Sequence, residues 1–117
     1  MSSHAKLTKR FSRRHGPKKM LLKGLMVNLI ENQKIVTTEA KAKELKRHFD
    51  KAVTLAKKQN LNSLRLLIAR LSNKDAAKKL YFEIAPNLKS RTSGYTSVIK
   101  MPNRKGDNSP MAFIQVL

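Results

Sequence analysis

The chain has 117 residues, of which 26 are lysine or arginine and 7 are aspartate or glutamate, so its formal net charge is +19. It has no cysteine, which excludes a disulfide framework and fits a reducing compartment, and no apolar run reaches the ~18 residues of a membrane span. Nor does the basic N-terminus lead into the apolar stretch of a secretory signal. Solubility alone needs a net charge of only about 2–8, so we expect a polyanionic partner, nucleic acid first and an anionic membrane surface second.

The basic residues are concentrated in two zones that contain no acidic residue. The first covers residues 1–30 and contains Lys6, Lys9, Arg10, Arg13, Arg14, Lys18, Lys19 and Lys23. The second covers residues 84–106 and contains Lys89, Arg91, Lys100, Arg104 and Lys105. A single isolated run of lysines is about as often an ordinary solvated surface as it is a binding site. Two acid-free zones favour binding.

The N-terminal residues 1–15 are polar and basic, with Leu7 and Phe11 as their only large apolar side chains. We expect them to form an arm that has no core of its own. Gly16-Pro17 begins a predicted helix that Asn32 ends. Its apolar residues recur at helical spacing and predict a broad buried stripe: Leu21, Leu22, Leu25, Met26, Leu29 and Ile30.

The central part of the chain predicts one strand and three helices. Residues 34–37 are β-branched and short enough for a strand, and Thr38 is a candidate N-cap for a helix to about Lys58. That helix has a basic face opposite an apolar face formed by Ala42, Leu45, Phe49, Ala52, Val53 and Ala56. A third helix, starting from Asn60 or Asn62, covers residues 62–72, and a fourth covers 75–85 and ends before Pro86.

The C-terminal part predicts two strands, at residues 95–101 and 111–117, joined by a turn from Pro102 to Pro110. Phe113 alternates as a core residue would. The order is then helix, strand, three helices, two strands. We therefore expect a basic arm over residues 1–15 and one two-layer α+β domain over 16–117.

The sequence offers no convergent set of catalytic or metal-binding groups. Its seven acids are dispersed, and several have a lysine four residues away, which is typical of solvated ion pairs. His4, His15 and His48 are widely spaced and have no cysteine beside them, so zinc is not indicated. We expect no enzyme activity, metal, cofactor or small-molecule substrate.

Aromatic residues make up only 5% of the chain, so base stacking on a sheet is not indicated. We expect recognition of the backbone and shape of folded, largely paired nucleic acid. Two alternatives stay open. A DNA-architectural or regulatory protein could use the helix pair at 62–85, and a nucleic-acid enzyme would need an acid such as Asp107.

Two blocks of residues carry a resemblance to a known family. One is Gly94-Tyr95-Thr96, Ile99-Lys100, Arg104 and residues 106–112, and the other is Ile35-Val36-Thr37-Thr38 followed by Ala42-Lys43-Glu44-Leu45 and Leu55-Ala56-Lys57. In order and spacing the chain resembles the bacterial large-subunit ribosomal protein seventeen family over nearly its whole length.

The resemblance implies four helices layered on a small three-stranded mixed sheet. It also implies a structural role in the large subunit of cytoplasmic ribosomes, bound to large-subunit ribosomal RNA near the rim of the peptide exit tunnel, beside other ribosomal proteins. The family's RNA contacts are the basic arm and the loop around Arg104-Lys105, in agreement with the charge pattern. The predicted RNA-binding residues are Lys6, Lys9, Arg10, Arg13, Arg14, His15, Lys18, Lys19, Lys23, Arg91, Lys100, Arg104 and Lys105.

Overall fold

A computed structural model describes residues 15–117, with side chains from Lys19 onward. Its elements are α1 (His15–Asn32), β1 (Lys34–Thr38), α2 (Glu39–Ala56), α3 (Leu61–Leu71), α4 (Lys74–Lys79), the π-helical segment η1 (Leu80–Ile84), α5 (Ala85–Asn87), β2 (Thr96–Met101) and β3 (Met111–Val116). Because α4, η1 and α5 follow one another without a break, they form one helical segment. The predicted α+β order is therefore confirmed, whereas the predicted arm lies outside the described residues except for His15.

The predicted N-cap Thr38 is confirmed, and of the two predicted starts of the third helix, Asn60 and Asn62, Asn60 is the N-cap. Thr38 precedes α2 in extended conformation, and its hydroxyl accepts a hydrogen bond from the Lys41 amide at 3.4 Å. Asn60 forms a capping box before α3: its side chain accepts from the Ser63 amide at 2.7 Å, while the Asn60 amide donates to the Ser63 hydroxyl at 3.3 Å. These bonds satisfy amides that would otherwise have no partner in the first turn of each helix.

The turn between α3 and α4 is tight because two adjacent residues end one helix and begin the next. Ser72 is left-handed, with φ 53°, and its amide donates to the Ile68 carbonyl at 2.8 Å. Asn73 returns to extended backbone, and its side chain accepts from the Ala76 amide at 2.9 Å. This turn brings α4 back against α3.

The sheet is antiparallel throughout, so the expected mixed sheet is wrong. Its strand order is β1-β3-β2, and β3 pairs antiparallel with both neighbours. The strands β1 and β2 run in the same direction, and they would form a parallel pair if they were neighbours. The C-terminal strand β3 lies between them. Parallel pairing is therefore absent, because the hairpin returns β3 into the centre of the sheet.

Pro86 does not end the fourth helix, contrary to the prediction. The helix widens over η1, where the Ala85 amide donates to the Leu80 carbonyl five residues earlier, and it continues to Asn87. Proline lacks an amide hydrogen and its ring crowds the carbonyl four residues before it. A π-helical turn before Pro86 shifts the hydrogen-bond register, which lets the helix pass the proline.

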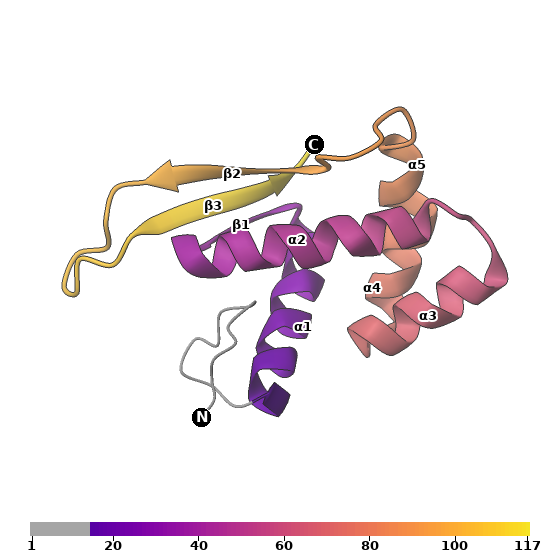
Figure 1. Cartoon of the computed structure of the whole chain (residues 1–117), viewed down its shortest axis with the longest axis horizontal. Helices are drawn as coiled ribbons and strands as arrows, with labels where there is room; N and C mark the ends of the chain where they lie inside the picture. Colours follow the sequence, from indigo (N-terminus) through magenta and orange to yellow (C-terminus); the bar gives the residue numbers. More distant parts are fainter. Residues whose placement is uncertain (1–14) are drawn as a thin grey trace, which may run out of the picture.

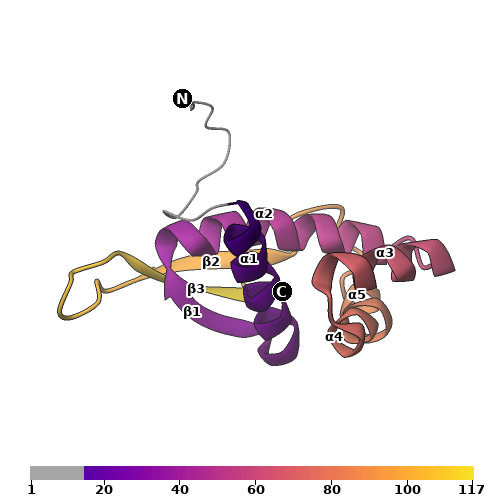
Figure 2. The ribbon, with the colours of Figure 1, turned by 90° about the horizontal axis from the view of Figure 1, so that it is seen from below.

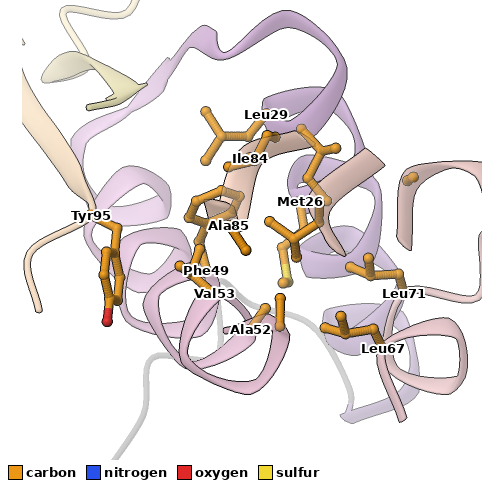
Figure 3. Packing of buried hydrophobic residues seen from close by; sticks show 14 of the residues in the cluster. Met26, Leu29, Phe49, Ala52, Val53, Leu67, Leu71, Ile84, Ala85 and Tyr95 are labelled. Atoms are coloured by element: carbon orange, nitrogen blue, oxygen red, sulfur yellow. The ribbon is translucent and has the colours of Figure 1, made fainter. Parts of the chain in front are cut away.

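The long helix α2 lies across one face of the sheet, and α1 crosses α2 near the middle of α2 (Figures 1 and 2). The helices α3 to α5 stand beyond the end of the sheet and pack on α1 and α2, so the two-layer expectation holds only for α2 over the strands. Phe49 of α2 is fully buried, near Met26, Leu29 and Ile84 (Figure 3). One core therefore joins the sheet end to the helical end.

The prediction that Phe113 belongs to the core is wrong. The neighbouring residues Ala112 and Ile114 are the buried ones, on the face toward α2. Since side chains alternate along a strand, Phe113 lies on the other face, in register with Val36 and Ile99, which are 56% and 42% exposed.

Candidate nucleic-acid interface

The loop that joins β2 and β3, residues 102–110, projects at one end of the molecule (Figure 1), and we call it the hairpin tip. It is closed by two backbone hydrogen bonds, from the Arg104 amide to the Ser109 carbonyl and from the Asn108 amide to the Arg104 carbonyl, each 2.9 Å. Gly106 and Asn108 have φ of 102° and 57°, a region that glycine and asparagine tolerate best. The sequence Gly-Asp-Asn thus supplies the turn that the loop needs.

Arg104 is engaged within the hairpin tip. Its Nε and Nη2 atoms donate to the two carboxylate oxygens of Asp107 at 3.1 and 2.7 Å, and the Ser109 amide donates to the same carboxylate at 3.1 Å. The hydrogen bond from Arg104, followed by that from Ser109, holds the pKa of Asp107 well below its ordinary value. Asp107 in turn raises the pKa of Arg104. The predicted RNA-binding Arg104 therefore has an internal competitor for its guanidinium.

Three further predicted cations lie along this hairpin: Lys105 in the tip, Lys100 near the end of β2, and Arg91 in the loop that precedes β2. Within the described residues, Lys105 is exposed and has no acidic side chain at ion-pair distance. The Lys100 side chain is 80% exposed and its ammonium lies 3.5 Å from the Glu39 carboxylate, a type of surface pair that contributes little stability. The Arg91 side chain is exposed, while its carbonyl accepts a hydrogen bond from the Lys57 ammonium. All three can present positive charge to an anion.

The first helix carries two predicted residues whose side chains are described. Lys19 is exposed on the first turns of α1. Lys23 is half-buried, and its ammonium donates to the Ser72 hydroxyl at 2.8 Å, which ties α1 to the α3–α4 turn. His15 and Lys18 belong to α1, but their side chains lie outside the description, as do the predicted arm residues Lys6, Lys9, Arg10, Arg13 and Arg14.

Other cations hold the fold together. The Lys46 ammonium donates to the Thr96 carbonyl at 2.7 Å, and Lys79 donates to the Glu31 carbonyl at 3.0 Å. Lys57 lies 4.9 Å from the centre of the Tyr95 ring and donates to its hydroxyl at 3.2 Å. These three join elements distant in sequence, so they are not free for a ligand.

The predicted residues do not form one cluster. The hairpin tip lies at one end of the longest axis, whereas α1 begins on a different side of the molecule (Figures 1 and 2). Sequence reasoning also overlooked Lys51 of α2 and Arg70 of α3, which line the same groove between α1, α2 and α3. A single arginine in the last turn of an amphipathic helix carries no sequence signal for binding, since that position favours a cation in any helix.

The described part of the chain shows neither a metal-binding cluster nor a membrane-spanning helix. In residues 15–117 no group of three or more histidine, cysteine, aspartate or glutamate side chains is placed to hold a metal ion. Over the same residues, none of the helices combines the length and apolar character needed to cross a membrane.

Comparison with known proteins gives a consistent result. A family model described as ribosomal protein L17 matches residues 21–117. A protein named large ribosomal subunit protein bL17 from Bdellovibrio bacteriovorus is 46% identical over 115 residues, which cover 98% of this chain and 64% of that protein. Proteins of the same name from Aliarcobacter butzleri and Natranaerobius thermophilus are 47% and 41% identical over 109 residues, covering 93% of this chain and 94% and 96% of theirs. The chain thus spans just under two thirds of the first relative and nearly all of the other two.

Proposed function

The chain belongs to the ribosomal protein L17 family, and from this premise we propose that it is a structural constituent of the large ribosomal subunit that binds and stabilises folded large-subunit ribosomal RNA. The resemblance seen in the sequence is thereby confirmed. Membership in a family of ribosomal proteins assigns the chain a non-enzymatic role, as expected, and places it on the cytoplasmic ribosome.

One observation supports RNA as the partner more than any other: the exposed cations of the described residues outnumber the acids that could neutralise them. The hairpin tip offers Lys105, and the helical end offers Lys19, Lys51 and Arg70 without an ion-pair partner among the described residues. Phosphates would neutralise these charges and release counterions, which makes binding favourable and strongly dependent on salt. The net charge of +19 would otherwise oppose a compact state.

Three elements would make the contacts. The arm over residues 1–15 would thread between RNA helices, the start of α1 would meet phosphates through Lys18, Lys19 and Lys23, and the sheet side would contribute Arg91, Lys100, Arg104 and Lys105. The domain over residues 16–117 would be the folded body that positions them. As the family resemblance implies, we place the protein near the rim of the peptide exit tunnel, beside neighbouring large-subunit proteins.

Sedimentation of cell extracts tests the assignment. We expect the endogenous protein to travel with large ribosomal subunits at moderate salt and to be released only at high salt, because its contacts are mainly ionic. Recovery of the protein free of large subunits at moderate salt would contradict the proposal. Preference of the purified chain for duplex DNA over large-subunit ribosomal RNA would favour the DNA-architectural alternative.

Removal of residues 1–15 tests the role assigned to the arm. The variant loses Lys6, Lys9, Arg10, Arg13 and Arg14, so we expect RNA affinity to fall about 100-fold and the dependence of log affinity on log salt to flatten by roughly 3–5. A Lys78→Gln variant of the full chain, which removes one exposed cation of α4, is the control. Loss of the cooperative thermal transition on truncation would show that the arm is part of the core.

A further inference from the structure

A groove of about 520 Å³ lies between α1, α2 and α3, and we call it the three-helix groove. Its floor is apolar and comes from all three helices: Leu22, Met26, Ala52, Leu66 and Ala69. The first three are buried side chains at the edge of the core, whereas Leu66 is 42% exposed and Ala69 is also exposed. In Figure 3 Met26 and Ala52 lie on the side of the core that faces Leu67 and Leu71 of α3. The volume lies within the range of pockets that hold small ligands.

The rim of the three-helix groove is positively charged. It carries Lys19 and Lys23 from α1, His48 and Lys51 from α2, and Arg70 from α3, and no acidic residue lines it. The described residues place no acid at ion-pair distance from Lys19, Lys51 or Arg70.

The acids nearest in sequence to this rim already have partners, one of which, His48, belongs to the rim itself. Glu44 accepts from Arg47 at 2.6 Å and lies 3.4 Å from His48. Asp50, which borders the adjoining hollow beside Lys51, lies 3.6 Å from Lys46 and accepts from the Thr96 hydroxyl at 3.3 Å. Lys19, Lys51 and Arg70 therefore have no carboxylate at ion-pair distance within the described residues, and an external anion can bind them.

The combination of an apolar floor and a cationic rim limits the occupant. Residues 1–14 carry basic charges and no acid, and a second copy would carry the same +19 charge, so neither complements the rim. A nucleotide does, because it joins an anionic phosphate to a flat base with apolar faces. Proteins hold the unstacked bases of RNA loops and bulges on aromatic side chains and on arginine guanidinium planes, and they hold flipped bases between aromatic or apolar side chains.

We propose that the three-helix groove takes one unstacked nucleotide of the folded RNA, with its base against Leu66 and Met26 and its phosphates on Lys51 and Arg70. The proposal rests on the proposed function, since it assumes that RNA is the partner. It adds a contact that depends on the shape of the RNA at one nucleotide, whereas the arm and the hairpin tip meet the backbone.

Two matched pairs of variants on α3 test the groove, each using the full chain and titration with large-subunit ribosomal RNA. Leu66→Trp fills the groove, while Leu61→Trp makes the same change at a residue of α3 that is 60% exposed and does not line it. Arg70→Gln removes a rim charge, while Arg65→Gln removes an exposed charge that lies outside the groove. Thermal melts confirm that all four variants are folded, and Lys105→Gln reports on the hairpin tip.

We expect Leu66→Trp to weaken binding about tenfold without changing the salt slope, because no charge is lost, and Arg70→Gln to weaken it about tenfold and lower the slope by about 1. Leu61→Trp and Arg65→Gln should change affinity less than about threefold. Crosslinking of 4-thiouridine-substituted RNA should then join one nucleotide to the peptide that contains Leu66.

Three results would overturn the groove assignment. If Leu66→Trp and Arg70→Gln behave like their controls while Lys105→Gln weakens binding, the groove is not an RNA site but the proposed function stands. If Leu66→Trp leaves RNA affinity intact yet reduces incorporation into large subunits, the occupant is a protein segment. If the groove variants, Lys105→Gln and the arm deletion all leave RNA affinity unchanged, the proposed function fails as well.

Discussion

The hairpin tip and the three-helix groove present cations in opposite ways. At the tip, Arg104 is bound by Asp107 within the same loop, and local hydrogen bonds define the conformation of residues 103–109, while at the base of the loop the Pro110 carbonyl accepts from the Glu39 amide at 3.0 Å. At the groove, Lys51 and Arg70 come from different helices that a shared core holds in place, and no acid lines the groove between them. The tip is thus a self-contained loop, whereas the groove exists only when the body is folded.

This difference has a consequence for binding. A phosphate that approaches Arg104 must compete with a bidentate carboxylate, so the net gain from that contact is reduced. A phosphate at Arg70 meets no carboxylate at ion-pair distance from that guanidinium within the described residues. Variants that act on the core should therefore abolish the groove and spare the tip, and variants of Asp107 should act on the tip alone.

The largest expected effect is on the core beneath the groove. Phe49→Ala removes a fully buried aromatic side chain, and we expect the free energy of unfolding to fall by about 3–5 kcal/mol, because the cavity adds to the lost burial. Urea denaturation measures the change. A domain of this size has a total free energy of unfolding of only about 5–15 kcal/mol, so a substantial fraction of the variant should be unfolded or nearly so at 37 °C.

Lys105→Gln at the exposed tip is the comparison for Phe49→Ala in the core. We expect it to change the free energy of unfolding by less than about 0.5 kcal/mol. If both variants changed the unfolding midpoint equally, the tip would be part of the cooperative body and the comparison would fail. Crosslinking of the two variants to RNA under native conditions would add a second check, since contacts at the groove should be lost selectively in Phe49→Ala.

A smaller effect is expected at the cap of α3, the helix that forms one wall of the groove. Asn60→Ala removes the acceptor for the Ser63 amide at 2.7 Å, and should cost about 1 kcal/mol of unfolding free energy. Asn103→Ala at the tip removes only an exposed contact to the Asn108 side chain at 3.2 Å and should cost less than about half of that. Hydrogen exchange should place the loosened amides in the first turn of α3.

Much of this fold follows from local signals in the sequence. Thr38 caps α2 as the sequence predicts, Asn60 is one of the two starts predicted for α3, and the apolar spacing of Leu29, Phe49 and Val53 identifies the core. Interactions that are not local account for the errors. The central position of β3 depends on how the hairpin docks beside β1, and the passage of the helix through Pro86 depends on a π-helical turn that no residue pattern marks.

The candidate site was less predictable than the fold. The acid-free zones in the sequence predict Lys19, Lys23 and Lys105 as binding residues. In the structure Lys19 and Lys105 are exposed, and Lys23 donates a hydrogen bond to Ser72. The acid-free zones could not show that Arg104 is paired with Asp107, because that bond forms in a turn whose backbone is left-handed at Gly106 and Asn108. Nor could they join Lys51 to Arg70, since only tertiary packing brings those residues to one groove.

The smallest effect concerns the pairing that distinguishes the tip. Because the folded-state pKa of Asp107 is depressed, this carboxylate contributes stability above its unfolded pKa of about 3.9, and that contribution is lost as pH falls through the folded value. Asp107→Asn should therefore lower the melting temperature slightly at pH 5 and by less at pH 2, where part of that contribution is already lost.

The same variant frees the Arg104 guanidinium, so at pH 7 we expect RNA affinity to rise about threefold and the salt slope to steepen by about 1. Asp75→Asn on α4 makes the same change in net charge without releasing an arginine, and filter binding of both variants at several salt concentrations separates the two causes. A rise confined to Asp107→Asn would show that the internal carboxylate limits Arg104. Equal rises would mean that overall charge governs both regions alike, and the contrast between tip and groove would then rest on shape alone.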